Sequence, residues 1–265
     1  MDLGLKGKGA LVTGASSGLG YATAEMLMRE GADVVLNSRN IPRLEEAAKR
    51  IEAATGRKPG IAVGDLAQPT DIPMLVGIAK RILPNKRIDI LVSNTGGPPA
   101  GMFMEHAKQS WPEVADLLLH SAIFLTRELV SDMADRGWGR LIYITSIAAL
   151  QPVDDLILSN TYRAGLTGFC KSISNTYAKF GITANTVCPG YTATERLTEL
   201  ATSRAAKSGK TPQEIMNGLG AQCPAGRVGK PEELAAVIAF LCSDHAAYIT
   251  GSSIPVDGGS KRALI

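Results

Sequence analysis

The sequence lacks several features that would place it in a specialised class of protein. Aromatic residues make up only 5% of its 265 residues, and 28 basic against 25 acidic side chains leave a net charge of +3. Such a chain is not built to stack on bases or to bind nucleic acid or an anionic membrane. No apolar run approaches the roughly 18 residues that a membrane-spanning helix needs. The N-terminal residues lack the basic-then-apolar order of a signal peptide, so we expect a cytoplasmic protein.

Cysteine is scarce, and its spacing does not suit a metal site. No CxxC pair is present. The pattern therefore predicts no metal and four reduced, mostly packed thiols. These are Cys170, Cys188, Cys223 and Cys242.

What the chain does contain is an alternation of short β-rich and longer helical segments. We expect strands at residues 10–13, 33–37, 61–63, 88–92, 141–145, 182–187 and 253–256. We expect helices at 21–30, 43–54, 111–136, 161–179 and 231–241. This order predicts βαβ units and an α/β fold with a mostly parallel sheet. No long linker interrupts the chain, so we expect one domain over residues 1–265, with a helical, substrate-covering insertion at about 192–226 that has mobile ends.

A glycine-rich turn follows the first expected strand. It reads Thr13-Gly14-Ala15-Ser16-Ser17-Gly18-Leu19-Gly20 and leads directly into a helix. Gly14 allows a sharp turn, Gly18 leaves room for a pyrophosphate, and Gly20 lets the helix approach the strand. The helix N-terminus offers free N–H groups to a phosphate. The alternative is a plain strand-to-helix turn, but the position between strand and helix favours dinucleotide binding.

The GxxxGxG spacing resembles the TGxxxGxG motif of the short-chain dehydrogenase/reductase family. The resemblance continues along nearly the whole chain, through Asp65, the Ser93-Asn94-Thr95-Gly96 segment, the Pro189-Gly190…Thr194 segment and the C-terminal segments 226–233 and 248–259. It implies a Rossmann-like, doubly wound three-layer α/β/α domain, usually in a homo-oligomer (tetramer or dimer). Within the family the pattern is most similar to reductases of the 3-oxoacyl-carrier-protein type. A 3-oxoacyl substrate is therefore implied only by analogy with these reductases.

The end of the second strand bears on which nucleotide binds. An acidic residue at the Ser38 position would bind the 2′-hydroxyl of NAD, whereas Ser38 is uncharged and Arg39 offers a donor fork for a 2′-phosphate. We therefore expect NADP(H) rather than NAD(H), although Arg39 as a plain surface arginine is the alternative. The resemblance and the glycine turn together imply cofactor contacts from Gly14, Ser16, Ser17, Gly18, Leu19, Gly20, Ser38, Arg39, Asp65, Leu66, Asn94, Gly96, Arg163, Pro189, Gly190, Thr192 and Thr194.

The catalytic residues depart from the family pattern. The family uses a Ser, a Tyr, a Lys four residues after the Tyr, and an Asn. Ser146 fits the serine, and the segment 163–168 aligns Arg163 with the lysine. Ser159 then stands at the tyrosine position, 13 residues after Ser146, which is the family spacing. We therefore expect Ser146, Ser159 and Arg163 at the reaction centre, with a weaker general acid than usual.

Other residues are weaker candidates. Tyr162 is turned by about 100° from the face that Ser159 and Arg163 share, so we expect it to pack rather than react. The asparagine position falls on Leu118 when counted from Trp111 and on Leu119 when counted from Phe124, which suggests a local change in this helix. Tyr191 and His120 are possible replacement donors, although ordinary loop or surface roles are favoured for both.

Three functions compete. The first is an NADP(H)-dependent oxidoreductase acting on a small carbonyl or alcohol compound. The second is a nucleotide-binding sensor or partner subunit with little or no redox turnover. The third is a halohydrin-dehalogenase-like enzyme, suggested by Arg163 but opposed by Ser159 and by the intact glycines at 14, 18 and 20. We also expect the segment 96–99 to form a stiff wall over the nicotinamide pocket, or else a plain surface turn.

Overall fold

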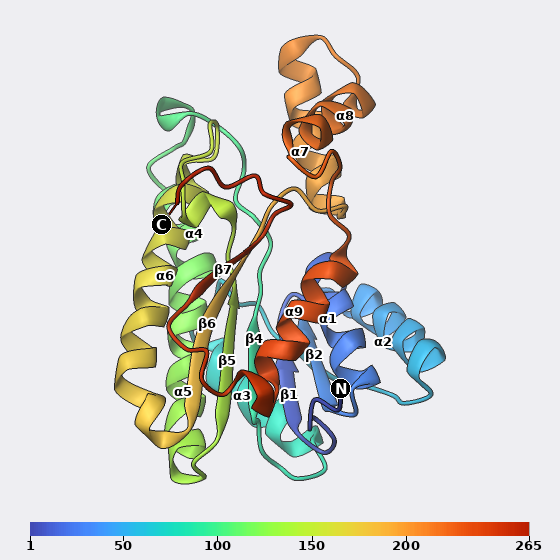
Figure 1. Ribbon diagram of the computed structural model, residues 1–265, viewed down its shortest axis with the longest axis vertical. Helices are drawn as coiled ribbons and strands as arrows, with labels where there is room; N and C mark the ends of the chain where they lie inside the picture. The colour runs from blue at the N-terminus through green and yellow to red at the C-terminus, as the bar shows by residue number, and fades with distance from the viewer. Residues whose placement is uncertain (265) are drawn as a thin grey trace.

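The computed structural model describes residues 1–264 and is built around one seven-stranded sheet (Figure 1). The strand order is β3-β2-β1-β4-β5-β6-β7, and every neighbouring pair is parallel. The strands are β1 (Gly9–Val12), β2 (Asp33–Ser38), β3 (Gly60–Val63), β4 (Ile90–Ser93), β5 (Gly139–Ile144), β6 (Ile182–Pro189) and β7 (Ser253–Val256). All of the strands expected from the sequence are confirmed, and so is the doubly wound order, which reverses between β1 and β4.

Helices cover both faces of the sheet. They are α1 (Gly18–Arg29), α2 (Ile41–Thr55), α3 (Asp71–Ile82), α4 (Ser110–Ala115), α5 (Ser121–Asp135), α6 (Ile157–Tyr177), α7 (Glu195–Ser208), α8 (Pro212–Gln222) and α9 (Pro231–Cys242). Shorter turns are η1 (Phe103–Glu105), η2 (Asp116–His120), η3 (Ile147–Ala149), η4 (Ala178–Phe180) and η5 (Asp244–Ala246). Among these residues no helix is both long and apolar enough to span a bilayer.

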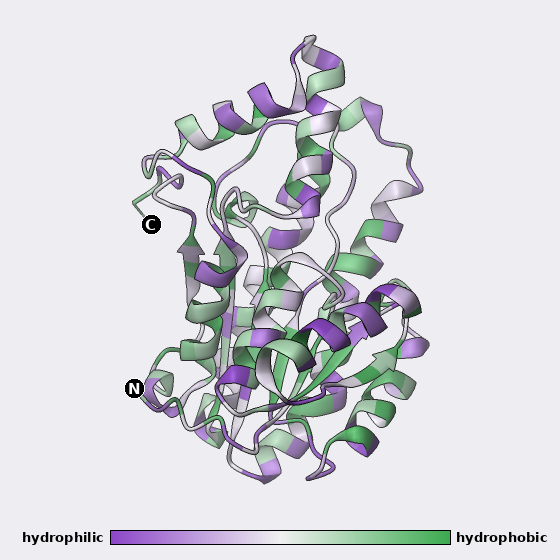
Figure 2. Ribbon diagram, turned by 90° about the vertical axis from the view of Figure 1, so that its right-hand side faces the viewer, coloured by the Kyte–Doolittle hydropathy of each residue, from purple (hydrophilic) through white to green (hydrophobic). Residues whose placement is uncertain are grey.

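The core lies in two layers because strand side chains alternate between the faces of the sheet. Val12 and Val92 pack with α1, α2 and α9 on one side, whereas Leu11 and Leu91 pack with α3, α5 and α6 on the other. Strands buried on both faces read as continuous apolar runs, which is how the sequence identified them. Figure 2 shows these strands in green at the centre and purple on many outward helix surfaces. All four cysteines are buried with free thiols.

The expected long helix at 111–136 is interrupted by a π-helical turn. Residues Asp116–His120 form this turn between α4 and α5. A π turn holds about one residue more than an α turn, so it shifts the register of all that follows by one. This extra residue explains the two counts for the expected asparagine position. Counting forward from Trp111 reaches Leu118, whereas counting back from Phe124 reaches Leu119.

Two helices occupy the segment that the sequence marks as an insertion. α7 and α8 lie beyond the carboxyl ends of the strands, at the top of Figure 1. Thr194 caps α7 by accepting a hydrogen bond from the Leu197 N–H, and Thr211 forms a capping box with Glu214 at the start of α8.

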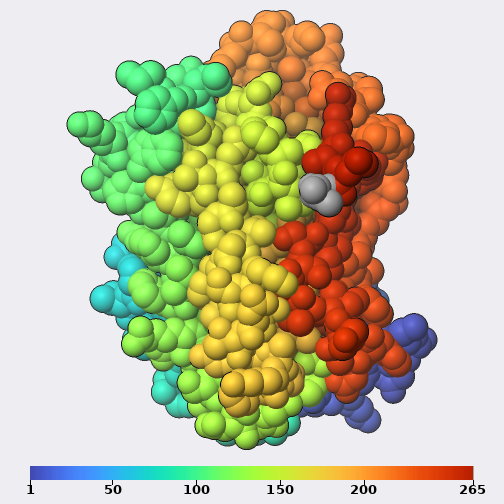
Figure 3. Space-filling model, turned by 60° about the vertical axis from the view of Figure 1, so that its left-hand side comes forward, coloured from blue at the N-terminus to red at the C-terminus, as the bar shows by residue number. Residues whose placement is uncertain are grey.

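α6 forms part of the outer surface of the molecule. In Figure 3 it runs in yellow between green segments and the red C-terminal segment. Its outward residues Ala164, Gly165 and Gly168 are small and exposed.

Candidate functional site

The glycine turn lies at the carboxyl end of β1, next to the point where the strand order reverses. Gly14 and Gly18 have φ of 55° and 58°, values that favour glycine. A Cβ on Gly14 would come within 2.8 Å of the Asn94 amide nitrogen, and one on Gly20 would collide with the Gly14 carbonyl oxygen. Close packing of the turn therefore requires glycine at 14 and 20, and the positive φ favours it at 18, whatever the turn binds.

Asn94 holds this turn to the end of β4. Its side-chain amide donates to the Thr13 carbonyl at 3.4 Å and to the Gly14 carbonyl at 3.2 Å. Its backbone N–H donates to Thr13 Oγ1, and Thr13 Oγ1 donates in turn to the Asn94 carbonyl. Asn94 thus fixes the shape of the cradle by bonding to the protein's own backbone.

The N-terminus of α1 can accept a phosphate. Ser17 is the N-cap residue, and its side chain makes no capping hydrogen bond. The first amides of a helix have no partner within the helix, so the N–H groups that follow Ser17 remain available, together with the positive end of the dipole. The turn at Ser16 precedes these N–H groups in the chain, and the amide of Leu19 is one of them. These features fit a dinucleotide pyrophosphate.

The side chains at the end of β2 and β3 form the neighbouring part of the cleft. Arg39 is 77% exposed, and its Nη1 lies 3.5 Å from Oδ2 of Asp65. The Ser38 hydroxyl accepts from the Asn40 N–H at 3.3 Å. As a serine, Ser38 brings no negative charge to this position. Leu66, three residues after β3, is buried. An exposed guanidinium held by one long ion pair can rotate to meet a phosphate.

Ser159 and Arg163 meet on α6, as the spacing predicted. Arg163 Nε donates to Ser159 Oγ at 3.1 Å, and its Nη1 donates to the carbonyls of Ile144 at 3.1 Å and Thr145 at 2.7 Å. The guanidinium thereby links α6 to the end of β5, directly before Ser146. Ser146 accepts a hydrogen bond from the Ala148 N–H at 3.1 Å. The structure therefore brings these three residues together at one strand end.

Arg163 is a buried cation without a carboxylate. The residue is 9% exposed, and none of the ion pairs formed within residues 1–264 includes it. Burial, with a further contribution from the charge of Arg196, lowers the pKa of Arg163 to about 10. It therefore remains protonated at neutral pH, and a positive charge faces this end of the sheet.

Tyr162 and His120 both contact neighbouring side chains. Tyr162 packs edge-on against Trp111, with ring centroids 6.2 Å apart, as its place on the helix predicted. His120 Nδ1 lies 2.7 Å from Oδ1 of Asp116 within the π turn. Leu118 is buried against Leu158. These contacts leave no side-chain amide at the position where the family has its asparagine.

The loop after β6 runs past the glycine turn. Pro189, the last residue of β6, is buried, and a Cβ on Gly190 would come within 2.8 Å of the Asp257 backbone. Thr192 pairs with Gly229 in an isolated bridge. Thr194 lies over Gly18, because a Cβ there would contact the Thr194 methyl group at 3.4 Å. The Thr194 side chain therefore borders the cradle.

α7 is anchored across the cleft by polar contacts along its length. Glu195 pairs with Arg43 of α2 and lies 3.5 Å from the Ser17 hydroxyl. Arg196 donates to the Pro98 carbonyl and would collide with a Cβ on Gly97, while Gly96 has open space beside it. The segment 96–99 is therefore attached to α7 through Arg196. The sequence did not indicate the Arg43–Glu195 pair, because residues 152 apart carry no local signal.

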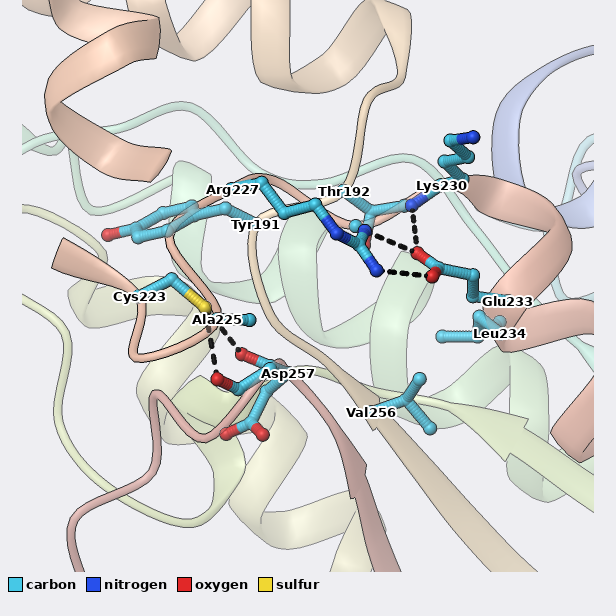
Figure 4. A pocket seen from close by; sticks show the side chains of 12 residues that line it. Tyr191, Thr192, Cys223, Ala225, Arg227, Lys230, Glu233, Leu234, Val256 and Asp257 are labelled. Carbon is cyan, nitrogen blue, oxygen red and sulfur yellow. Dashed lines mark hydrogen bonds and ion pairs between the residues drawn. The ribbon is translucent and has the colours of Figure 1, made fainter. Parts of the chain in front are cut away.

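Two cavities lie near this end of the sheet. The smaller, about 160 Å³, is surrounded by the Arg227–Glu233 ion pair and by Cys223, whose thiol donates to the Asp257 and Gly258 carbonyls (Figure 4). These groups satisfy one another, so this cavity offers little chemistry. The larger, about 480 Å³, lies between α7, α8 and the loops that follow β4, β5 and β6. Tyr191 borders both, with its ring pointing away from the Arg227–Glu233 pair in Figure 4.

Comparisons with known proteins agree with this geometry. A family model described as enoyl-(acyl carrier protein) reductase matches residues 14–261. The chain is 32% identical over 260 residues to the 3-oxoacyl-(acyl-carrier-protein) reductase FabG of Aquifex aeolicus, covering 98% of this chain and 99% of that protein. It is 32% identical over 261 residues to dehydrogenase/reductase SDR family member 4 of Bos taurus, covering 98% and 89%. The solved structure of L-sorbose reductase from Gluconobacter frateurii, complexed with NADPH and L-sorbose, matches with a TM-score of 0.93 and 34% identity over 100% of both chains.

Proposed function

Since this chain belongs to the short-chain dehydrogenase/reductase family, we propose which of its residues perform the family's reaction. It is an NAD(P)-dependent oxidoreductase acting on carbonyl or alcohol groups. We propose Ser146, Ser159 and Arg163 as its reaction centre. The observation that carries this assignment is the Arg163 guanidinium, which bonds both to Ser159 and to the strand end that bears Ser146.

We propose NADP(H) as the preferred cofactor. Arg39 is exposed at the end of β2, and Ser38 adds no carboxylate that would repel a 2′-phosphate. The similar L-sorbose reductase structure holds NADPH. The glycine turn, Asn94 and the N-terminus of α1 fit the pyrophosphate, and the loop from Pro189 to Thr194 borders the same cleft.

A nicotinamide bound in this cleft would supply the hydride that the carbonyl carbon accepts. Two serines then act on the carbonyl oxygen. Ser146 Oγ accepts from the Ala148 N–H, so its own proton is free to donate to the substrate. Arginine can only donate, so Ser159 Oγ must accept from Arg163, and its proton is free as well.

Arg163 stabilises negative charge that develops on the substrate oxygen and on Ser159. It acts from a buried site, where the effective dielectric constant is lower than in water and electrostatic interactions are therefore stronger. A serine hydroxyl is a far weaker acid than a tyrosine, so the protonation step is the one this centre performs least well. Solvent must replace the proton that Ser159 gives up.

The second candidate function is nucleotide binding with little or no turnover, as a sensor or partner subunit. The observation that favours it is the same pair, because Ser159 and Arg163 stand where the family has a tyrosine and a lysine. The cradle at α1 does not depend on that pair and would bind nucleotide in either case.

One experiment separates the two. NADPH and NADH binding is measured by calorimetry, and NADPH consumption is followed with a panel of carbonyl compounds. The wild type is compared with a double variant carrying Ser159→Tyr and Arg163→Lys. Turnover by the wild type supports our assignment. Tight NADPH binding with turnover only in the double variant would favour the second function.

We also propose that the protein is a homo-oligomer. The exposed small residues on α6 would allow a second copy to approach closely (Figure 3). Light scattering coupled to size-exclusion chromatography tests this, and a monomer mass at micromolar concentration would contradict it.

A further inference from the structure

The Arg163 guanidinium has one nitrogen without a partner. Its Nε bonds to Ser159 and its Nη1 to the end of β5, whereas Nη2 makes no hydrogen bond within residues 1–264. In that part of the chain Thr183 Oγ1 is the one enclosed side-chain polar atom without a partner, so Nη2 is reached by solvent. A side chain that is about nine-tenths buried therefore presents an unused N–H donor at the proposed reaction centre.

Arg163 also lacks the carboxylate that other arginines at the carboxyl end of the sheet have. Five of these form ion pairs, namely Arg39 with Asp65, Arg43 with Glu195, Arg196 with Glu199, Arg204 with Asp155 and Arg227 with Glu233. None of the five arginines is buried. The buried Arg163 takes part in none of the ion pairs formed within residues 1–264.

The carboxylates left over at this end of the sheet do not compensate Arg163. Asp154 and Asp257 follow β5 and β7 and form no ion pair with it. Asp154 is exposed, so solvent and salt screen its charge. The Asp257 carboxylate accepts hydrogen bonds from the N–H groups of Gly259 and Lys261. The positive charge of Arg163 is therefore not balanced by a contact with the protein itself.

An anionic ligand would offset the cost of holding this charge. Burial and then the positive charge of Arg196 lower the pKa of Arg163, because both disfavour the cation. A nucleotide at the α1 cradle places its pyrophosphate there, and its sugar hydroxyls could accept from Nη2 without compensating the charge. An anionic group on the substrate would both accept the bond and compensate the charge, since charge-assisted hydrogen bonds are the stronger ones.

The shape of the guanidinium narrows the kind of anion. Nη2 lies on the same edge of the planar fork as the Nε–H, which donates to Ser159 Oγ at 3.1 Å. A ligand oxygen on Nη2 therefore lies beside the Ser159 hydroxyl. We propose that the substrate is a 2-oxo acid, whose carboxylate binds Arg163 Nη2 while its ketone oxygen accepts from Ser159. These two oxygens stand on adjacent carbons, so they can meet neighbouring donors together.

This inference rests on the proposed oxidoreductase function and specifies its substrate class. The ketone carbon gains a hydride from NADPH, and the ketone oxygen gains a proton from Ser159, which recovers it from solvent. The carbon–oxygen double bond becomes a single bond, and the products are a 2-hydroxy acid and NADP⁺. The carboxylate stays bound to Arg163 throughout and keeps the ketone in place.

The test compares pyruvate with pyruvamide, which has a similar shape but no charge. Calorimetry measures the binding of each to the full chain loaded with NADP⁺, which cannot donate a hydride. Because a charge-assisted bond replaces a neutral one, we expect pyruvate to bind about ten- to hundredfold more tightly. This comparison uses the wild type and does not depend on the folding of any variant.

Variants of Arg163 assign the preference to this side chain. Arg163→Gln should weaken pyruvate binding at least tenfold and change pyruvamide binding less than about threefold. Arg163→Lys keeps the charge and should retain most of the preference, with circular dichroism checking that both variants fold. Arg127→Gln is the matched control, because Arg127 is exposed on α5 and forms no ion pair within residues 1–264. It makes the same change in net charge and should alter neither Kd.

The outcomes separate this inference from the proposed function. Equal affinity for the two ligands, no pyruvate binding, or a preference that survives in Arg163→Gln would overturn the substrate class, even if NADPH is consumed with other carbonyls. An Arg163-dependent preference for pyruvate without NADPH consumption on any 2-oxo acid would support the anion site and count against the redox function.

Discussion

Arg163 donates a hydrogen bond to Ser159, one helical turn before it, and this contact is the centre of the reaction site that we propose. Because the guanidinium cannot accept, it orients the Ser159 hydroxyl proton away from itself. Ser159→Ala should therefore lower kcat by about 10²-fold or more while leaving the NADPH Kd unchanged. Steady-state kinetics and calorimetry check this. Thr161→Ala, on the exposed face of the same helix, is the control, and an equal loss there would refute a role for the Ser159 proton.

Arg39 should decide between the two nucleotides. We expect Arg39→Ala to weaken NADPH binding roughly 10- to 100-fold, since one charge-assisted contact is lost, and to leave NADH binding nearly unchanged. Arg29→Ala removes a half-exposed arginine paired with Glu25 on α1 and should affect neither nucleotide. Parallel losses for NADPH and NADH would mean that Arg39 does not contact the 2′-phosphate.

Glu195 places a carboxylate 3.5 Å from the Ser17 hydroxyl, at the edge of the cradle. Its charge opposes a bound pyrophosphate, so Glu195→Gln should tighten NADPH binding about three- to tenfold at low salt. The gain should shrink as ionic strength rises. Glu199→Gln, one turn further along α7, is the matched control. A salt-independent change, or a loss of affinity, would argue that Glu195 acts only through its pairing with Arg43.

Gly20 and Gly218 are both helical glycines, yet their substitution should have opposite effects. A Cβ on Gly20 would collide with the Gly14 carbonyl, whereas Gly218 has nothing within 4 Å. We expect Gly20→Ala to lower the free energy of unfolding by about 1–3 kcal/mol and to impair nucleotide binding. Gly218→Ala should raise it by roughly 0.5–1 kcal/mol. Chemical denaturation measures both, and a Gly20→Ala protein as stable as wild type would show that the turn is looser than described.

Two buried thiols should make the protein less stable in alkali. Burial raises the pKa of Cys170 and of Cys242 to about 12, whereas an unfolded thiol titrates near 8.5. Their contribution is complete below the unfolded pKa and is lost as the pH rises toward 12, at up to about 1.4 kcal/mol per pH unit for each thiol. Urea unfolding between pH 8 and 10.5 tests this. Cys242→Ala should reduce the slope by one thiol, and an unchanged slope would contradict the assignment.

The sequence by itself determined the fold and the pairing of Ser159 with Arg163. Apolar strands buried on both faces and a glycine turn between strand and helix are local patterns, so the sheet and the cradle at Gly14–Gly20 could be predicted. Ser159 and Arg163 could be paired because residues four apart share a helix face. Even the π turn left a trace, as a one-residue mismatch between two counts.

Only the tertiary structure decided what surrounds that centre. The Arg204–Asp155 and Arg43–Glu195 pairs join residues 49 and 152 apart, and no spacing rule links such positions. No spacing rule predicts the burial of Arg163 against the end of β5 either. This burial strengthens the electrostatic interaction of its charge with nearby groups. These contacts depend on how α7 and the strand ends are brought together in space, and that is set by packing of the whole domain rather than by any local run of residues.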